Sequence, residues 1–97
     1  MTKVEEKLIK LGYVLDYEKQ ESNLCGLWIY RHYLKPYNKY FHLKIVYEIQ
    51  TNSKTFTLFP VKEPKFIWQI SKYTKLREQA FNQLQQDLEV LKEYEDS

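Results

Sequence analysis

A chain of 97 residues with 43% hydrophobic and 29% charged side chains has the size and composition of one folded domain, which excludes a two-domain protein and a disordered chain. Its single cysteine excludes an internal disulfide, and no apolar run approaches the roughly 20 residues that span a bilayer. We therefore expect a single domain over residues 1–97, located in the reducing cytoplasm and without a membrane segment.

The net charge of +2 conceals an uneven distribution along the chain. Residues 22–86 carry ten Lys or Arg against three Glu, which gives this segment a net charge of +7. Residues 87–97 carry five acidic residues against Lys92, a net charge of −4, and residues 1–21 carry −1. This pattern predicts a polarised surface that is basic in the middle of the chain and acidic at its end.

The first predicted element is a short amphipathic helix over about 2–11. Thr2 and Glu5 have the spacing of a capping box, in which each side chain bonds the main-chain N–H of the other residue. Apolar residues follow at helical spacing, and Gly12 stands where a helix C-terminus favours a left-handed residue. The sequence therefore gives both a start and a stop signal for this helix.

Three strands are predicted in the middle of the chain. Residues 13–15 either extend into the core or begin a short strand, and the polar residues 16–26 are typical of a loop. Aromatic and β-branched residues favour strands over Leu27–Leu34, Tyr40–Gln50 and Thr55–Val61. Apolar and polar residues alternate along the second of these, so one of its faces should be buried. Pro, Asn and Ser between the strands are turn residues and predict antiparallel hairpins.

The C-terminal part is predicted to be one long helix from about residue 74 to 94, with Thr74 as its N-cap. One face of this helix carries Arg77, Ala80, Phe81, Leu84, Leu88 and Leu91. Residues 65–70 are ambiguous, because their apolar residues alternate as in a strand but could also join the helix. We favour a short edge strand. The predicted fold class is α+β: a helix, a three- to four-stranded antiparallel sheet and a long C-terminal helix, with both helices packed on one sheet face.

The register of the first hairpin decides which side chains face away from the helices. A four-residue loop over 36–39 pairs Leu34 with Phe41 and places Trp28, Tyr30, His32 and Leu34 under the helices. A three-residue loop reverses this parity and buries Arg31. Because burying an unpaired guanidinium is costly, the four-residue loop is preferred. The outer face then presents Ile29, Arg31, Tyr33 and Lys35 beside Tyr40, His42, Lys44 and Val46.

This outer face and its adjoining turn form the predicted partner-binding surface. The residues expected to contact a partner are Arg31, Tyr33, Lys35, Tyr37, Lys39, Tyr40, His42 and Lys44. Tyrosine and arginine are enriched at the hot spots of protein interfaces. Aromatic rings beside cations also suit the bases and phosphates of single-stranded nucleic acid. A protein partner and a nucleic-acid partner are therefore two hypotheses that the residues alone leave open.

Catalytic chemistry is not predicted. The preferred register places His32 and His42 on opposite faces, and no second cysteine or clustered carboxylate completes a metal site. Cys25, without a histidine base, is interpreted as a packed or incidental residue, and Trp28 and Trp68 are interpreted as core anchors. We expect a non-enzymatic protein that holds no cofactor and no metal.

Two segments resemble small uncharacterised proteins of phages and prophages in low-GC Gram-positive bacteria. Residues 75–95, KLREQAFNQLQQDLEVLKEYE, resemble the C-terminal helix of those proteins, and residues 5–13, EEKLIKLGY, resemble their short N-terminal helix. The resemblance covers about a third of the chain and includes no catalytic motif. It implies a phage accessory protein that occupies the surface of a host protein, such as a nucleic-acid-handling defence enzyme, as anti-CRISPR and other anti-defence inhibitors do.

The long helix leaves two further alternatives open. Its acidic end could imitate the phosphates of nucleic acid, although a solvated terminus is the simpler interpretation. Its apolar stripe could form the seam of a homodimer, so the sequence is compatible with a monomer and with a homodimer.

Overall fold

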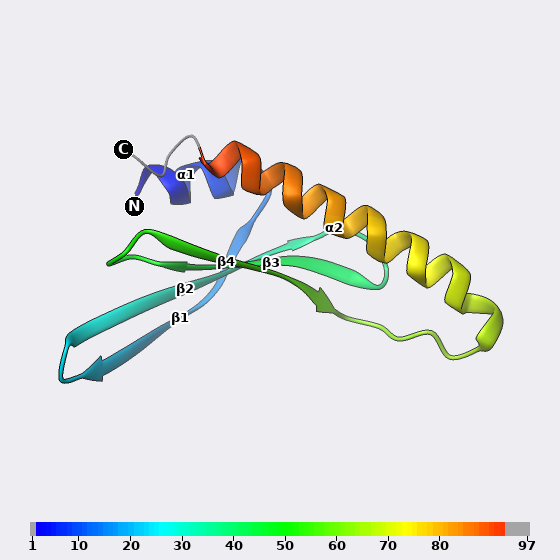
Figure 1. Cartoon of the computed structure of the whole chain (residues 1–97), viewed down its shortest axis with the longest axis horizontal. Coiled ribbons are helices and arrows are strands. Elements are labelled where there is room, and N and C mark those ends of the chain that lie inside the picture. Colours follow the sequence, from blue (N-terminus) through cyan, green and yellow to red (C-terminus); the bar gives the residue numbers. More distant parts are fainter. Residues whose placement is uncertain (1, 93–97) are drawn as a thin grey trace.

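The computed structural model of the chain describes residues 2–92, which have an α+β fold (Figure 1). The elements follow in the order α1 (Lys3–Lys10), β1 (Val14–Asn23), β2 (Gly26–Pro36), β3 (Phe41–Glu48), β4 (Ser53–Pro60), the 3-10 turn η1 (Ile67–Gln69) and α2 (Ile70–Lys92). The strands form one antiparallel sheet in the order β1-β2-β3-β4. This confirms the predicted fold class, with four strands. The last two residues of the predicted helix and the acidic end beyond them lie outside the described residues.

The predicted capping box begins α1. The Glu5 main-chain N–H donates to the Thr2 hydroxyl at 3.2 Å, and the Glu5 carboxylate accepts from the Thr2 main-chain N–H at 3.4 Å. The helix ends at Lys10, and Gly12, two residues further on, has a φ of 102° in the left-handed region. The N–H groups of Gly12 and Tyr13 donate to the carbonyls of Ile9 and Leu8, the two bonds of a Schellman motif. These local signals direct the chain from α1 straight into the sheet.

The core lies between the sheet and the two helices. Phe41, Leu43, Ile45 and Tyr47 are the buried residues of β3, as the alternation predicts. They pack with Val4 and Leu8 of α1, Tyr13, Tyr33 and Tyr40, and Ala80, Leu84 and Leu91 of α2. Complete burial of a side chain such as that of Leu43 contributes about 1.5–3 kcal/mol. Most of the stability from apolar burial therefore comes from one face of the sheet.

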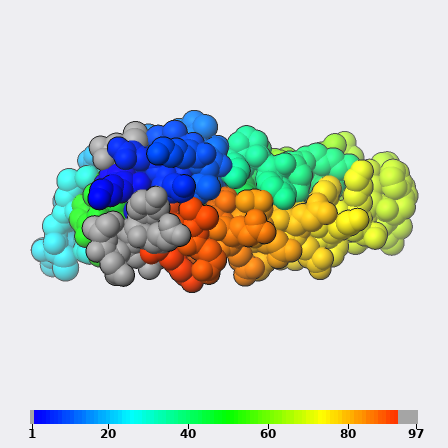
Figure 2. All heavy atoms as spheres, turned by 90° about the horizontal axis from the view of Figure 1, so that it is seen from above, coloured from blue at the N-terminus to red at the C-terminus, as the bar shows by residue number. Residues whose placement is uncertain are grey.

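Both helices lie on that face, as predicted, and α1 lies beside the C-terminal half of α2 (Figures 1 and 2). We call the opposite face, over which residues 2–92 place no helix, the open face. Its residues are Val14, Tyr17, Lys19 and Glu21 of β1, Trp28, Tyr30, His32 and Leu34 of β2, His42, Lys44, Val46 and Glu48 of β3, and Ser53, Thr55, Thr57 and Phe59 of β4. Within the described chain, neither helix combines the length and the apolar character that crossing a bilayer requires.

The predicted loop over 16–26 is wrong, because most of these residues belong to β1. This edge strand pairs with β2 from Val14↔Leu34 to Asn23↔Gly26, and every one of its residues is exposed. Main-chain hydrogen bonds therefore hold β1 in place, and hydrophobic periodicity carries no signal for a strand that buries no side chain.

The predicted register of β2 on β3 is also wrong. Tyr33 pairs with Ile45 and Leu34 with Lys44, which gives β2 the opposite parity. Trp28, Tyr30, His32 and Leu34 consequently belong to the open face, whereas Arg31, Tyr33 and Lys35 face the helices. The prediction assumed that a buried Arg31 would be unpaired, but α1 brings a carboxylate to it.

The favoured edge strand at residues 65–70 does not form, and the alternative, in which these residues lead into the helix, is confirmed. The 3-10 turn η1 continues into α2, which begins at Ile70 and not at Thr74. The Gln69 side-chain carbonyl accepts from the main-chain N–H of Lys65 at 2.9 Å and of Phe66 at 3.3 Å, which stabilises this turn. Trp68 is 73% exposed and stacks on Phe66, so its predicted role as a core anchor is wrong. Trp28 is only half-buried, on the open face.

Candidate binding surface on the open face

Arg31 and Tyr33, two of the predicted contact residues, lie on the helix side in a cluster around Glu5. The Arg31 Nη1 donates to both Glu5 carboxylate oxygens at 2.7 and 2.8 Å, and its Nε donates to Glu18 at 2.9 Å. The Tyr33 hydroxyl donates to the same Glu5 carboxylate, which is 1% exposed. Burial disfavours the charge on Glu5, but the bonds from Arg31, Tyr33 and Thr2 outweigh it, so the pKa of Glu5 lies below its ordinary value. These two residues therefore fix α1 to the sheet instead of forming an outer surface.

Lys35, a third predicted contact residue, is engaged in a second cluster around Asp87 of α2. The Asp87 carboxylate is 3% exposed and accepts from the Tyr13 hydroxyl at 2.9 Å and from the Lys35 ammonium at 3.4 Å. The Gln83 side-chain amide donates to its other oxygen at 3.1 Å. Burial and the neighbouring carboxylate raise the pKa of Tyr13 above its ordinary value. Lys35 thus joins β2 to α2, and its predicted place on the outer face is wrong.

The turn between β2 and β3 contains Tyr37, Lys39 and Tyr40. Tyr40 is 2% exposed and packs edge-on against Tyr73 of α2, with 5.1 Å between the ring centroids, so the prediction that it faces outward is wrong. Tyr37 and Lys39 are exposed and lie in the turn, as predicted. The side-chain amide oxygen of Asn38 accepts from the main-chain N–H of Tyr40 and of Phe41, which fixes the shape of this turn.

His42 and Lys44 are the predicted contact residues that the structure does place on the open face. They are joined there by three rings that the sequence reasoning did not select. Tyr17 of β1 stacks on His32 of β2, with 4.0 Å between the ring centroids and 15° between the ring planes. Phe59 of β4 stacks more loosely on His42, at 6.3 Å and 24°. His32 and His42 therefore share one face, contrary to the prediction.

The Lys44 ammonium connects the two stacks. It lies 5.7 Å from the centroid of the Tyr17 ring and 5.5 Å from that of Phe59, within the range of a cation–π interaction. Tyr17 is 46% exposed and Phe59 is 39% exposed, so both rings present area to a partner. We call these five residues, Tyr17, His32, His42, Lys44 and Phe59, the aromatic cluster. All four strands contribute to it.

A one-residue bulge in β1 brings Tyr17 into the aromatic cluster. Leu15 pairs with Tyr33 on the helix side and Tyr17 pairs with His32 on the open face, so Asp16 is an additional residue between the two pairs. Without the bulge, the alternation of the strand would turn Tyr17 toward the helices. The same shift places Glu18 opposite Arg31 on the helix side.

The aromatic cluster disfavours the charged form of the His32 imidazole. Burial and the nearby Lys44 ammonium lower the pKa of His32 below its ordinary value of 6.5. The Nδ1 atoms of His32 and His42 are both buried and have no hydrogen-bond partner within residues 2–92. The wider open face is nearly balanced in charge, because Glu21 and Glu48 accompany Lys19 and Lys44 and the Lys19–Glu21 pair closes at 3.1 Å.

Two signals in the sequence could have revealed the aromatic cluster. The even-numbered residues of β2 and β3 include two histidines and a lysine, which are poor residues for a sheet face covered by helices. A register that places all three outward turns Arg31 toward the helices, where its guanidinium needs a carboxylate partner. Glu5 of the predicted capping box could supply that carboxylate. Tyr17 could not be found in this way because it lies in a segment with no periodicity.

Comparisons with family models, with curated proteins and with solved structures find no match to this chain. Within residues 2–92, no group of three His, Cys, Asp or Glu side chains is arranged to hold a metal ion. Cys25 is exposed in the turn between β1 and β2.

Proposed function

We propose that this chain is a non-enzymatic binding protein whose open face docks on a protein of a bacterial host. The observation that supports this is the aromatic cluster, in which Lys44 lies over rings from β1 and β4 that stack on two histidines, on a face that no described helix covers. Tyr and Trp make large contacts at low entropic cost, and Trp28 and Tyr30 extend the same face. The near balance of charge on this face favours a protein over a polyanion.

The resemblance of residues 5–13 and 75–95 to phage proteins is the reason for placing the partner in a host cell. A phage protein of this kind acts by covering a functional surface of its target, so the proposed outcome of binding is inhibition or modulation. A nucleic-acid-handling defence enzyme is the class of target that the resemblance implies.

Single-stranded nucleic acid is the second candidate ligand, and the position of Lys44 favours it. Bases stack on exposed rings such as those of Tyr17 and Phe59, while an ammonium group between the rings meets the phosphates. The two candidates differ in their salt dependence, because the affinity for a polyanion falls linearly with the logarithm of the salt concentration.

The test is capture of partners from a Gram-positive host lysate by the tagged protein, with and without nuclease, followed by mass spectrometry. The expected result is one host protein that survives nuclease and is lost with the Tyr17→Ala, Phe59→Ala double variant. Phe66→Ala, which removes a similarly exposed ring outside the open face, is the matched control and should retain the partner. Material that disappears with nuclease, and binds with a steep salt slope, would reject the protein partner in favour of nucleic acid.

A further inference from the structure

The outer edge of β4 presents main-chain groups without a partner strand. β4 is the last strand of the sheet, and none of the strands within residues 2–92 pairs with its outer side. In an antiparallel ladder, pairs that exchange main-chain hydrogen bonds alternate with pairs that do not. The Val61 N–H donates to the Tyr40 carbonyl at 2.9 Å, so the hydrogen-bonded pairs fall at Val61 and at every second residue of β4 before it. The N–H and C=O groups of Phe56 and Leu58 therefore point away from β3. Such an edge is a template for one more strand.

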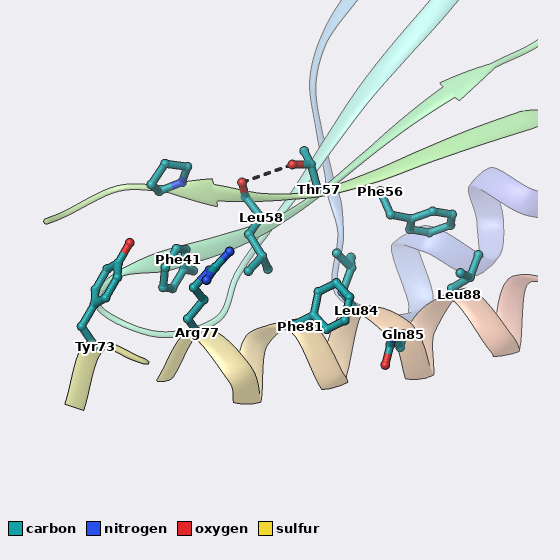
Figure 3. Close-up of a pocket in the computed structure, with 11 residues that line it drawn as sticks. Phe41, Phe56, Thr57, Leu58, Tyr73, Arg77, Phe81, Leu84, Gln85 and Leu88 are labelled. Carbon is teal, nitrogen blue, oxygen red and sulfur yellow. Dashed lines mark hydrogen bonds between the residues drawn. The ribbon is translucent and has the colours of Figure 1, made fainter. Parts of the chain in front are cut away.

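An apolar groove of about 590 Å³ runs between this edge and α2 (Figure 3). The side chains of Phe56 and Leu58 enter it from β4, and Phe81, Leu84 and Leu88 enter it from α2. Phe81 is 50% exposed, although Ala80 and Leu84 on either side of it are fully packed. β1, the other edge strand, has no comparable lining, since all of its side chains are exposed.

The groove carries one cation near the end of β4. Arg77 lines it beside Leu58 and Pro60, and it makes no ion pair or hydrogen bond within residues 2–92. A guanidinium on an apolar wall is well suited to a carboxylate, which it binds through two parallel hydrogen bonds. The groove therefore provides main-chain groups without a partner strand, apolar walls and one positive charge within reach of a single ligand.

We propose that an extended peptide segment of a partner protein adds to β4 as a fifth strand. Its main chain pairs with Phe56 and Leu58, its alternate apolar side chains enter the groove beneath α2, and an acidic side chain or terminal carboxylate meets Arg77. Side chains of a strand point to opposite faces in turn, so the ligand needs apolar residues at every second position. This site lies on the helix side and is separate from the aromatic cluster.

A second copy of this chain is a poorer occupant of the groove. Its own edge strand, Ser53–Pro60, contains no Asp or Glu, so two copies joined through β4 would leave both Arg77 side chains without a carboxylate from the added strand. The apolar stripe of α2 is also not free to form a dimer seam, because Ala80, Leu84 and Leu91 are buried within one copy.

The test is selection of a displayed library of random 12-residue peptides on the immobilised full chain, followed by synthesis of the most enriched sequence. We expect alternating apolar residues with an Asp or Glu to be enriched. The synthetic peptide should bind at least roughly tenfold more weakly to Arg77→Glu, and a peptide with Lys in place of its acidic residue should recover on this variant. Lys75→Glu, an exposed charge reversal on the same helix, should leave binding unchanged.

Hydrogen exchange measured by NMR locates the bound peptide. The amides of Phe56 and Leu58 should become protected when the peptide is added, and Tyr17→Ala should bind it like the native chain. A peptide that is indifferent to Arg77→Glu, or a selection without alternating apolar residues, would overturn the proposal. If these amides become protected without peptide as the protein concentration rises, the chain dimerises through this edge. That result would assign the edge to a second copy and would also overturn the proposal.

Discussion

The two faces of this sheet are built from alternate residues of the same strands, but they differ in whether their buried polar groups have hydrogen-bond partners. On the helix side, the carboxylates of Glu5 and Asp87 are almost fully buried, and each accepts hydrogen bonds from a tyrosine and a cation. On the open face, His32 and His42 are held by stacking, and their Nδ1 atoms have no partner within residues 2–92. Hydrogen-bonded polar groups stabilise the helix side, whereas these two buried nitrogen atoms leave the open face with unsatisfied polar groups. The helix side therefore carries more of the polar stabilisation of the fold than the open face.

The largest expected effect is on the helix side. Leu43→Ala, at a fully buried position of β3, should lower the free energy of unfolding by about 3 kcal/mol because it leaves a cavity in the core. Val46→Ala, three residues along the same strand but on the open face, should cost less than about 1 kcal/mol. Urea denaturation of both variants measures the difference. Equal losses for the two would mean that both faces contribute to the core.

The next effect concerns the buried carboxylate of α1. Glu5→Gln should lower the free energy of unfolding by about 2–3 kcal/mol, because it leaves Arg31 without its main counterion and removes a charged acceptor from Tyr33. Glu6→Gln, an exposed neighbour on the same helix, should change it by less than about 0.5 kcal/mol. If both substitutions were neutral, the cluster would contribute no net stability.

The pH dependence of stability provides a second test of the buried Glu5 carboxylate, again with the Glu5→Gln variant. Since the pKa of Glu5 in the folded protein lies below its ordinary value of 4.5, its contribution to stability is complete above that value and is lost as the pH falls through the folded pKa. Unfolding curves from pH 6 to pH 2 should therefore show a steeper acid loss for the native chain than for Glu5→Gln. Parallel pH curves for the two proteins would contradict the assignment.

The smallest effect is on the open face. Tyr17→Ala should change stability by less than about 1 kcal/mol, because the ring is half exposed on an edge strand. It should nevertheless raise the pKa of His32 toward 6.5, since the stacked ring contributes to the burial that lowers it. An NMR titration of the His32 ring protons measures this pKa. Phe59→Ala, which uncovers His42 instead, is the control, and an unmoved His32 pKa in Tyr17→Ala would show that the stack does not shield the imidazole.

Local signals predicted more of the fold than of the candidate site. The Thr2–Glu5 capping box, Gly12 and the alternation of β3 each depend on neighbouring residues, and the structure confirms all three. The parity of β2 depends on a contact between Arg31 and Glu5, 26 residues apart, and a local argument about an unpaired charge could not include it. The place of His32 in the aromatic cluster follows from that parity, whereas His42 and Lys44 were already predicted on the outer face. The place of Tyr17 follows from a bulge in a strand whose polar sequence is typical of a loop.

The bulge in β1 also determines which insertions and deletions the open face can tolerate. Asp16 is the additional residue that reverses the facing of the side chains after it in β1, so that Tyr17, Lys19 and Glu21 lie on the open face. Because all side chains of β1 are exposed, deleting Asp16 would exchange its two sets of side chains without opening a hole in the core. Insertion or deletion at this position thus offers a homologous chain a route to an open face of different composition on the same scaffold.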